Sequence, residues 1–129
     1  MKLIAKILVV LALLHCGTAV QAQNETDLLV QHLQTGNFNA LKSFWGNQVE
    51  SSILDQVSNQ PLNAQQANET LQAFFNQKNI VGFDKSAERK LGNTLYLTGK
   101  LLSSQQKYNL TLLLQTTKTG FVIVSMRVN

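Results

Sequence analysis

Apolar and polar positions along the chain change from a helical period to an alternating one near residue 79. Leu29 and Leu33, four positions apart, predict a short helix over residues 25–35. The longest predicted helix runs over Ala64–Gln77, because Asn63 is a good N-cap and an apolar stripe recurs at helical spacing. The members of this stripe are Ala67, Leu71, Phe74 and Phe75.

Between these two helices the chain is predicted to form one more short helix and one strand. Asn37 is suited to cap the helix, and Gly46-Asn47 is suited to end it. Alternation of side chains then predicts a strand over Val49–Val57, with Asp55 on the same face as Val49 and Ile53.

After residue 79 the alternating period predicts a series of strands separated by turn residues. Their ranges are Ile80–Lys90, Thr94–Leu102, Lys107–Thr117 and Phe121–Val128. In the last of them, an unbroken alternation puts Val122, Val124, Met126 and Val128 on one face. Helices followed by hairpin-linked strands indicate an α+β fold, with N-terminal helices packed on a curved antiparallel sheet of about four to six strands.

The first 22 residues have a different pattern, which is typical of a secretory signal peptide. Lys2 and Lys6 precede an apolar run over residues 7–14, and the following segment ends at Ala22, after which cleavage is predicted. The run is roughly half of the ~20 residues that span a bilayer. We therefore expect residues 23–129 to form one domain, exported to the periplasm or the extracellular side, with no transmembrane segment. Lipidation at Cys16 is the less favoured alternative, because His15 is a poor residue at that position.

Removal of this leader changes what the composition implies. The chain has 11 basic and 7 acidic residues and a net charge of +4, and loss of Lys2 and Lys6 reduces the charge to about +2. The remaining basic residues are spread over several strands, so nucleic-acid binding is not expected. Cys16, the only cysteine, lies in the leader, and His32 is the only histidine outside it. No disulfide framework, metal site or cofactor is therefore expected.

Several segments carry a resemblance to a known superfamily. They are Gly36-Asn37 followed by Leu41 and Phe44, the strand from Val49, the helix end Leu71–Phe75, and the closing strand from Gly120. Together they resemble the nuclear-transport-factor-two-like (NTF2-like) superfamily, a cystatin-like α+β cone, and within it a group of small exported bacterial proteins of unknown function. The resemblance implies a curved sheet wrapped around helices, with a pocket at its open end. Superfamily members include isomerases, dehydratases and binding or dimerising modules, so the fold does not choose among these functions.

The favoured function is an exported, non-enzymatic binding or interaction module of unknown ligand. Such a module would hold a small apolar or amphipathic ligand in the cone, or form a homodimer through the open face of its sheet. The residues expected to line a pocket are aromatic, namely Phe38, Phe44, Trp45, Phe74, Phe75 and Tyr108. An aromatic stripe at helical spacing is more often part of a core, and in a cone fold the two roles overlap.

The alternative is a small pocket enzyme of the isomerase or hydro-lyase type. The resemblance implies an Asp base and a Tyr donor in a dry cavity, and the weak candidates are Asp55, Asp84 and Tyr96. The characteristic enzyme motifs of the superfamily are absent, so no residue is assigned a catalytic role. Arg127 is the basic residue with the clearest need for a partner, and a cross-strand acid is expected beside it.

Overall fold

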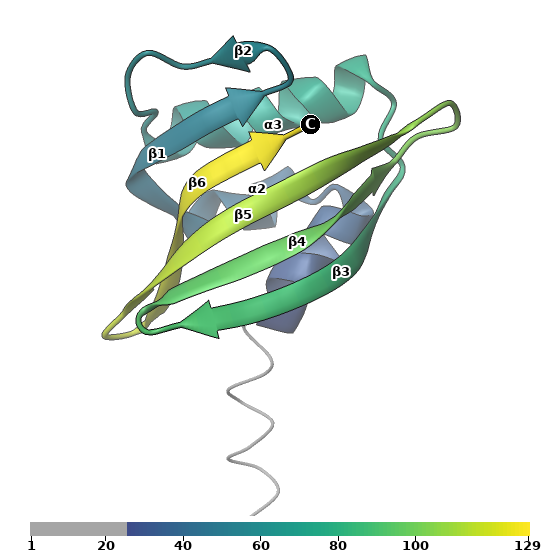
Figure 1. The fold of residues 1–129 in the computed structure, drawn as a ribbon. Helices are drawn as coiled ribbons and strands as arrows, with labels where there is room; N and C mark the ends of the chain where they lie inside the picture. The colour runs from purple at the N-terminus through teal and green to yellow at the C-terminus, as the bar shows by residue number, and fades with distance from the viewer. Residues whose placement is uncertain (1–25) are drawn as a thin grey trace, which may run out of the picture.

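Helices and one six-stranded sheet form two layers in the computed structural model, which describes residues 26–129 (Figure 1). The predicted signal peptide, its cleavage site and Cys16 lie outside the described residues. The helical layer consists of an N-terminal helix over residues 26–35, α2 (Phe38–Leu41) continued by the 3-10 turn η1 (Lys42–Phe44), and α3 (Ala64–Gln77). None of the described helices is both long and apolar enough to cross a membrane.

The helix starts follow from the capping residues in the sequence. The side-chain oxygen of Asn37 accepts a hydrogen bond from the Ala40 N–H, at 3.2 Å, and so caps α2. At α3, Asn63 and Gln66 form a reciprocal capping box, with distances of 2.8 and 3.0 Å between donor and acceptor atoms. The predicted bounds of α3 and its buried stripe are confirmed.

The sheet has the strand order β2-β1-β6-β5-β4-β3. The strands are β1 (Trp45–Ile53), β2 (Gln56–Val57), β3 (Gly82–Leu91), β4 (Thr94–Leu102), β5 (Lys107–Thr117) and β6 (Gly120–Val128). β3 to β6 form an antiparallel meander, whereas β1 pairs with β6 in parallel, so the curved sheet is mixed. The predicted α+β class, with helices on one face of a curved sheet, is confirmed. The sheet is not antiparallel throughout, as predicted, because β1 runs in the same direction as its neighbour β6.

The first strand begins and ends earlier than the sequence predicts. β1 starts at Trp45 and contains Gly46, which was predicted to end a helix. A Cβ atom at Gly46 would lie 3.2 Å from the Ile123 carbonyl oxygen, so glycine here allows β1 to lie close to β6. The strand ends at Ile53, and the chain reverses through Leu54 and Asp55 into β2. Asp55 therefore lies in an exposed turn and not on a strand face.

The alternation predicted for the last strand is wrong at its centre. The β5–β6 register shifts, so that Leu113 pairs with Ser125 but Leu114 pairs with Ile123, and Val124 has no partner on β5. Such a bulge changes which residues point inward. Ile123 is buried on one side of the bulge, whereas Met126 and Val128 are buried on the other.

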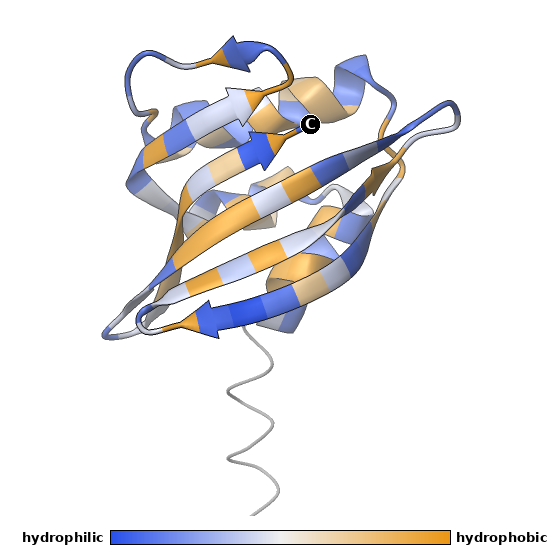
Figure 2. Ribbon diagram, in the orientation of Figure 1, coloured by the Kyte–Doolittle hydropathy of each residue, from blue (hydrophilic) through white to orange (hydrophobic). Residues whose placement is uncertain are grey.

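The inner face of the sheet packs against the helices and forms the core. Its leucines alternate with polar residues along most of β4, as Figure 2 shows, and Leu97, Leu101, Leu110, Leu112 and Leu114 are buried. The N-terminal helix adds Leu29 and Leu33 to the same cluster. None of the described helices lies over the outer face, which is turned towards the viewer in Figure 1.

Candidate functional site

The aromatic residues expected to line a pocket lie mostly in the core. Phe38, Trp45, Phe74, Phe75 and Tyr108 are all at least nine-tenths buried. Phe38 and Phe75 make an edge-to-face contact with ring centres 4.9 Å apart, and Phe74 and Tyr108 make another at 5.1 Å. These side chains therefore fill most of the space between the helices and the sheet.

One polar side chain is built into this aromatic core. The Trp45 indole N–H donates to the Asn68 side-chain oxygen at 2.9 Å, and the Asn68 amide donates to the Phe38 carbonyl at 3.0 Å. Asn68 thus connects α3 to α2 and β1. Its side-chain oxygen, its side-chain amide, the Trp45 indole N–H and the Phe38 carbonyl all have hydrogen-bond partners. Phe44, the sixth aromatic candidate, is half-buried in η1 with its ring centre 5.9 Å from that of His32.

The acid and phenol candidates for catalysis are exposed and separated. Asp84 lies on the outer face of β3 opposite Lys100, and Tyr96 lies on the same face, four residues from Lys100 along β4. Four strand residues span about 13 Å, which is well beyond hydrogen-bond reach. With Asp55 in the β1–β2 turn, the structure brings none of these acids together with Tyr96. Within residues 26–129, no three His, Cys, Asp or Glu side chains are grouped as metal ligands.

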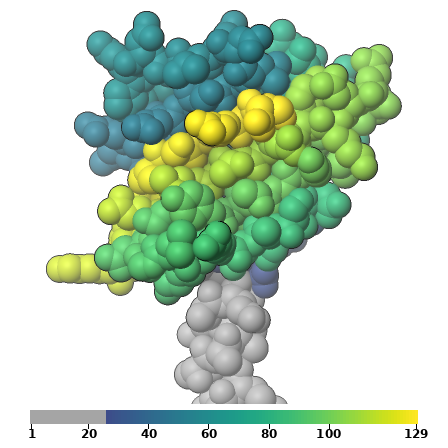
Figure 3. Space-filling view, viewed as in Figure 1, coloured from purple at the N-terminus to yellow at the C-terminus, as the bar shows by residue number. Residues whose placement is uncertain are grey.

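The outer face carries one continuous cross-strand row of side chains. The strand registers align Glu50, Ser125, Leu113, Tyr96 and Arg89, in this order from β1 to β3. Side chains in register share a face, so the row runs from an acid at one edge, over an apolar centre, to a base at the other. We call it the outer row. Figure 3 shows the uncovered face on which it lies.

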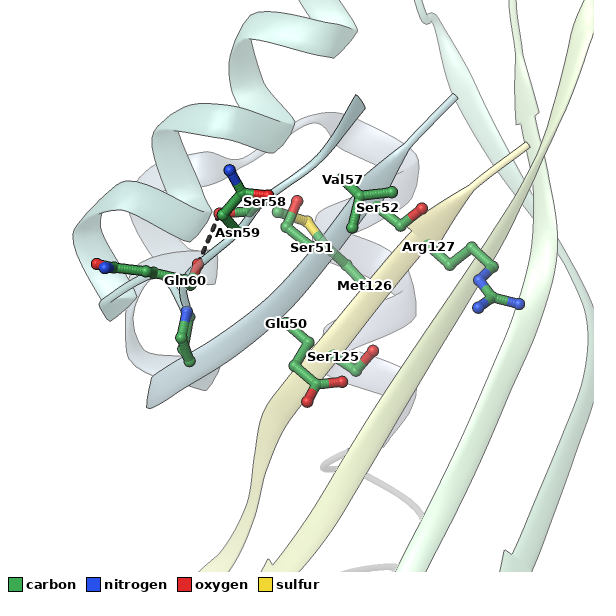
Figure 4. A pocket seen from close by; sticks show the side chains of 11 residues that line it. Glu50, Ser51, Ser52, Val57, Ser58, Asn59, Gln60, Ser125, Met126 and Arg127 are labelled. Atoms are coloured by element: carbon green, nitrogen blue, oxygen red, sulfur yellow. Dashed lines mark hydrogen bonds between the residues drawn. The ribbon is translucent and has the colours of Figure 1, made fainter. Parts of the chain in front are cut away.

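Arg127 lies beside this row without the expected acidic partner. Its neighbours across the strands are Ser52 on β1 and Thr111 on β5. Figure 4 shows its guanidinium directed away from Glu50. Among the described residues the one ion pair joins Lys85 and Glu88, at 3.5 Å on β3. The ends of the outer row, Glu50 and Arg89, are therefore not held in ion pairs within the described part of the chain.

Two cavities flank the β1–β2 hairpin. The first, of about 290 Å³, lies between β1, β6 and the loop over residues 58–61, where the Ser58 hydroxyl donates to the Gln60 carbonyl (Figure 4). The second, of about 470 Å³, lies between the hairpin and α3, and we call it the hairpin groove. Ten side chains, none of them charged, line the groove: Ser51, Ile53, Gln56, Val57, Ser58, Leu62, Thr70, Ala73, Phe74 and Gln77.

Most residues of the outer row and the hairpin groove were not selected from the sequence. The sequence does carry a signal for Leu113, because it is the middle residue of three consecutive leucines in a predicted strand. One leucine of such a triplet must point away from the core. Of the six aromatic candidates, Phe74 also lines the hairpin groove.

Comparison with known proteins identifies relatives of this fold. A family described as "Domain of unknown function (DUF4783)" matches residues 26–129. The chain is similar to a DUF4783 family protein from Bacteroides ovatus, with 17% identity, a TM-score of 0.71, and coverage of 78% of this chain and 89% of that one. A DUF4783 family protein from Bacteroides fragilis matches with 22% identity, a TM-score of 0.70, and coverage of 78% of this chain and 92% of that one.

More distant similarities have the same architecture. An NTF-2 like protein of unknown function from Silicibacter pomeroyi matches with 10% identity, a TM-score of 0.57, and coverage of 88% of this chain and 97% of that one. No curated protein matches the chain in sequence. At these identities the solved structures show the fold alone, which is NTF2-like.

Proposed function

The chain belongs to the DUF4783 family, and we propose that it is a non-enzymatic interaction module that pairs with a second copy through the outer face of its sheet. The leader predicted from residues 1–22 would direct it to the periplasm or the extracellular side. The observation that carries this proposal is the outer row. Its two ends have opposite charge and its centre is apolar, which makes it complementary to itself.

The charges select one way of pairing two such faces. If a two-fold axis runs parallel to the strands through Leu113, Glu50 of one copy faces Arg89 of the other, and the converse pair forms at the opposite end. If the axis instead runs across the strands, like charges face each other at both ends. Electrostatic complementarity therefore favours the first arrangement, with the strands of the two sheets nearly aligned.

The centre of the row provides apolar surface to bury. Leu113 is half-buried in one copy, and Tyr96 on β4 is 38% exposed, with its phenol group free of any hydrogen bond to described residues. Val122 and Val124 on β6 add further apolar surface next to Leu113, around a shallow hollow that Glu50 also lines. Apolar centres with polar or charged margins are typical of protein–protein interfaces.

A charge exchange tests this arrangement by sedimentation equilibrium. Glu50→Arg and Arg89→Glu should each weaken self-association by about 10-fold or more, because each places like charges at both ends of the row. The double variant should restore association close to that of the unmodified protein. Leu113→Glu should produce a monomer at all concentrations.

The control is Glu69→Arg, which changes an exposed charge on α3, on the opposite side of the sheet. It should leave self-association unchanged. A protein that stays monomeric at millimolar concentration, or a double variant no stronger than either single one, would contradict the proposal.

A further inference from the structure

We infer that the hairpin groove is a separate binding site for a small uncharged molecule rich in hydroxyl or amide groups. The groove lies between α3 and the β1–β2 hairpin, on the opposite side of the sheet from the outer row. It is therefore independent of the pairing proposed above, and either proposal can fail without the other.

The size and the charge of the groove restrict what it can hold. Its volume of about 470 Å³ lies within the range of small-molecule sites, about 300–1,000 Å³. None of the described charged side chains lines it, so a phosphate, a carboxylate or an ammonium group that contacts its walls would find no counter-charge there. The groove thus selects against ionic ligands.

Ser51 provides a hydrogen-bonding group in the wall of this groove. It lies on the inner face of β1, is 8% exposed, and lines the groove. No hydrogen bond joins its hydroxyl to another described residue. Every fully enclosed polar side-chain atom of the described residues does have a hydrogen-bond partner. The hydroxyl is therefore not fully enclosed. Ser51 lines both the hairpin groove and the first cavity, and its hydroxyl can both donate to and accept from a ligand.

The other walls of the groove match a ligand with one polar and one apolar side. Gln77 on α3 and Gln56 on β2 provide amide groups, each with donors and an acceptor. Phe74 and Ile53 provide apolar surface in the same groove. Neutral sugars and N-acetylated sugars combine hydroxyl or amide groups with hydrocarbon faces, so they are suitable probes of this chemistry.

Nuclear magnetic resonance titration with matched neutral and charged probes tests the inference. The neutral probes are N-acetylglucosamine and glucose, and the charged ones are glucosamine and glucuronate. At least one neutral probe should shift the backbone signals of Ser51, Ala73 and Gln77 in a saturable way. The charged probes should bind at least 10-fold more weakly. No saturable shift from either neutral probe, or equal binding of the charged ones, would overturn the inference.

Two substitutions with matched controls localise the binding. Ser51→Ala should weaken it about 3- to 10-fold, as expected for loss of one hydrogen bond, whereas Ser52→Ala, on the opposite face of β1, should not. Ala73→Leu fills the groove from an exposed position on α3 and should abolish binding, whereas its neighbour variant Gln72→Leu should not. Unchanged binding in both Ser51→Ala and Ala73→Leu would overturn the inference. Thermal unfolding of each variant verifies that it is folded.

Discussion

The two faces of the sheet use the same strands for different purposes. On β5 the inner residues Leu110, Leu112 and Leu114 are fully buried against the helices. The outer residues Thr111 and Leu113 are only half-buried, because none of the described helices covers them. The inner face therefore holds the fold together, and substitutions on the outer face should cost the monomer less stability.

The largest expected effect comes from breaking the inner face at its centre. Leu112→Ala should lower the free energy of unfolding by about 2–5 kcal/mol, because it leaves a cavity beneath the helices. Domains of this size have total stabilities of about 5–15 kcal/mol, so the loss is a large part of the whole. Urea denaturation at a concentration where the protein is monomeric measures it.

The matched control is the next residue on the strand. Leu113→Ala on the outer face should cost the monomer about 1 kcal/mol or less, while it weakens self-association. Equal losses of unfolding free energy in the two variants would show that the outer face is part of the folding core, which contradicts the division between the faces.

The second effect concerns Asn68, a polar side chain inside the aromatic core. Asn68→Ala should cost about 2–3 kcal/mol, because it leaves the Trp45 indole N–H and the Phe38 carbonyl buried without partners. Gln72→Ala, exposed on the same helix, should change the free energy of unfolding by less than about 0.5 kcal/mol. A loss for Asn68→Ala no greater than for the control would mean that the network contributes nothing to stability.

The third effect concerns the close approach of β3 and β4. A Cβ atom at Gly99 would lie 2.4 Å from the Phe83 ring and 2.5 Å from the Asp84 carbonyl oxygen. Gly99→Ala should therefore force the strands apart and cost about 1–2 kcal/mol. At Gly82 the nearest atom, on Leu102, would be 3.5 Å from the Cβ, so Gly82→Ala serves as the control with little loss. Thermal unfolding compares the two.

Side-chain patterning was sufficient to predict most of the fold. The bounds of α3, β4 and β5 agree with the sequence, because each has a cap or turn residue at its ends and a consistent period within. The errors occur where contacts distant in sequence decide the conformation. The β6 bulge depends on its register with β5, and the early start of β1 depends on its parallel partner β6.

The candidate surfaces were less predictable for the same reason. The outer row joins residues from five strands, and only the registers show that Glu50 and Arg89 lie at its opposite ends. Alternation continues through residue 57 in the sequence and therefore predicts a strand face for Asp55. The turn that interrupts it is formed by a leucine with an uncommon backbone conformation, which no propensity predicts.

The smallest expected effect concerns the β1–β2 turn at Leu54. This turn belongs to neither face of the sheet, but it shapes one wall of the hairpin groove. Leu54 has a φ of 53°, in the left-handed region that bulky residues avoid, and its side chain is 40% exposed. Asparagine tolerates this region better, so Leu54→Asn should raise the free energy of unfolding by about 0.5–1 kcal/mol.

Leu91→Asn, at a residue that is 50% exposed and has no positive φ, should give no such gain. Urea denaturation of both variants measures the difference, and equal effects would mean that the turn stores no strain. A gain at Leu54 alone would show that the shape of the hairpin turn destabilises the protein. Neither face of the sheet requires this shape.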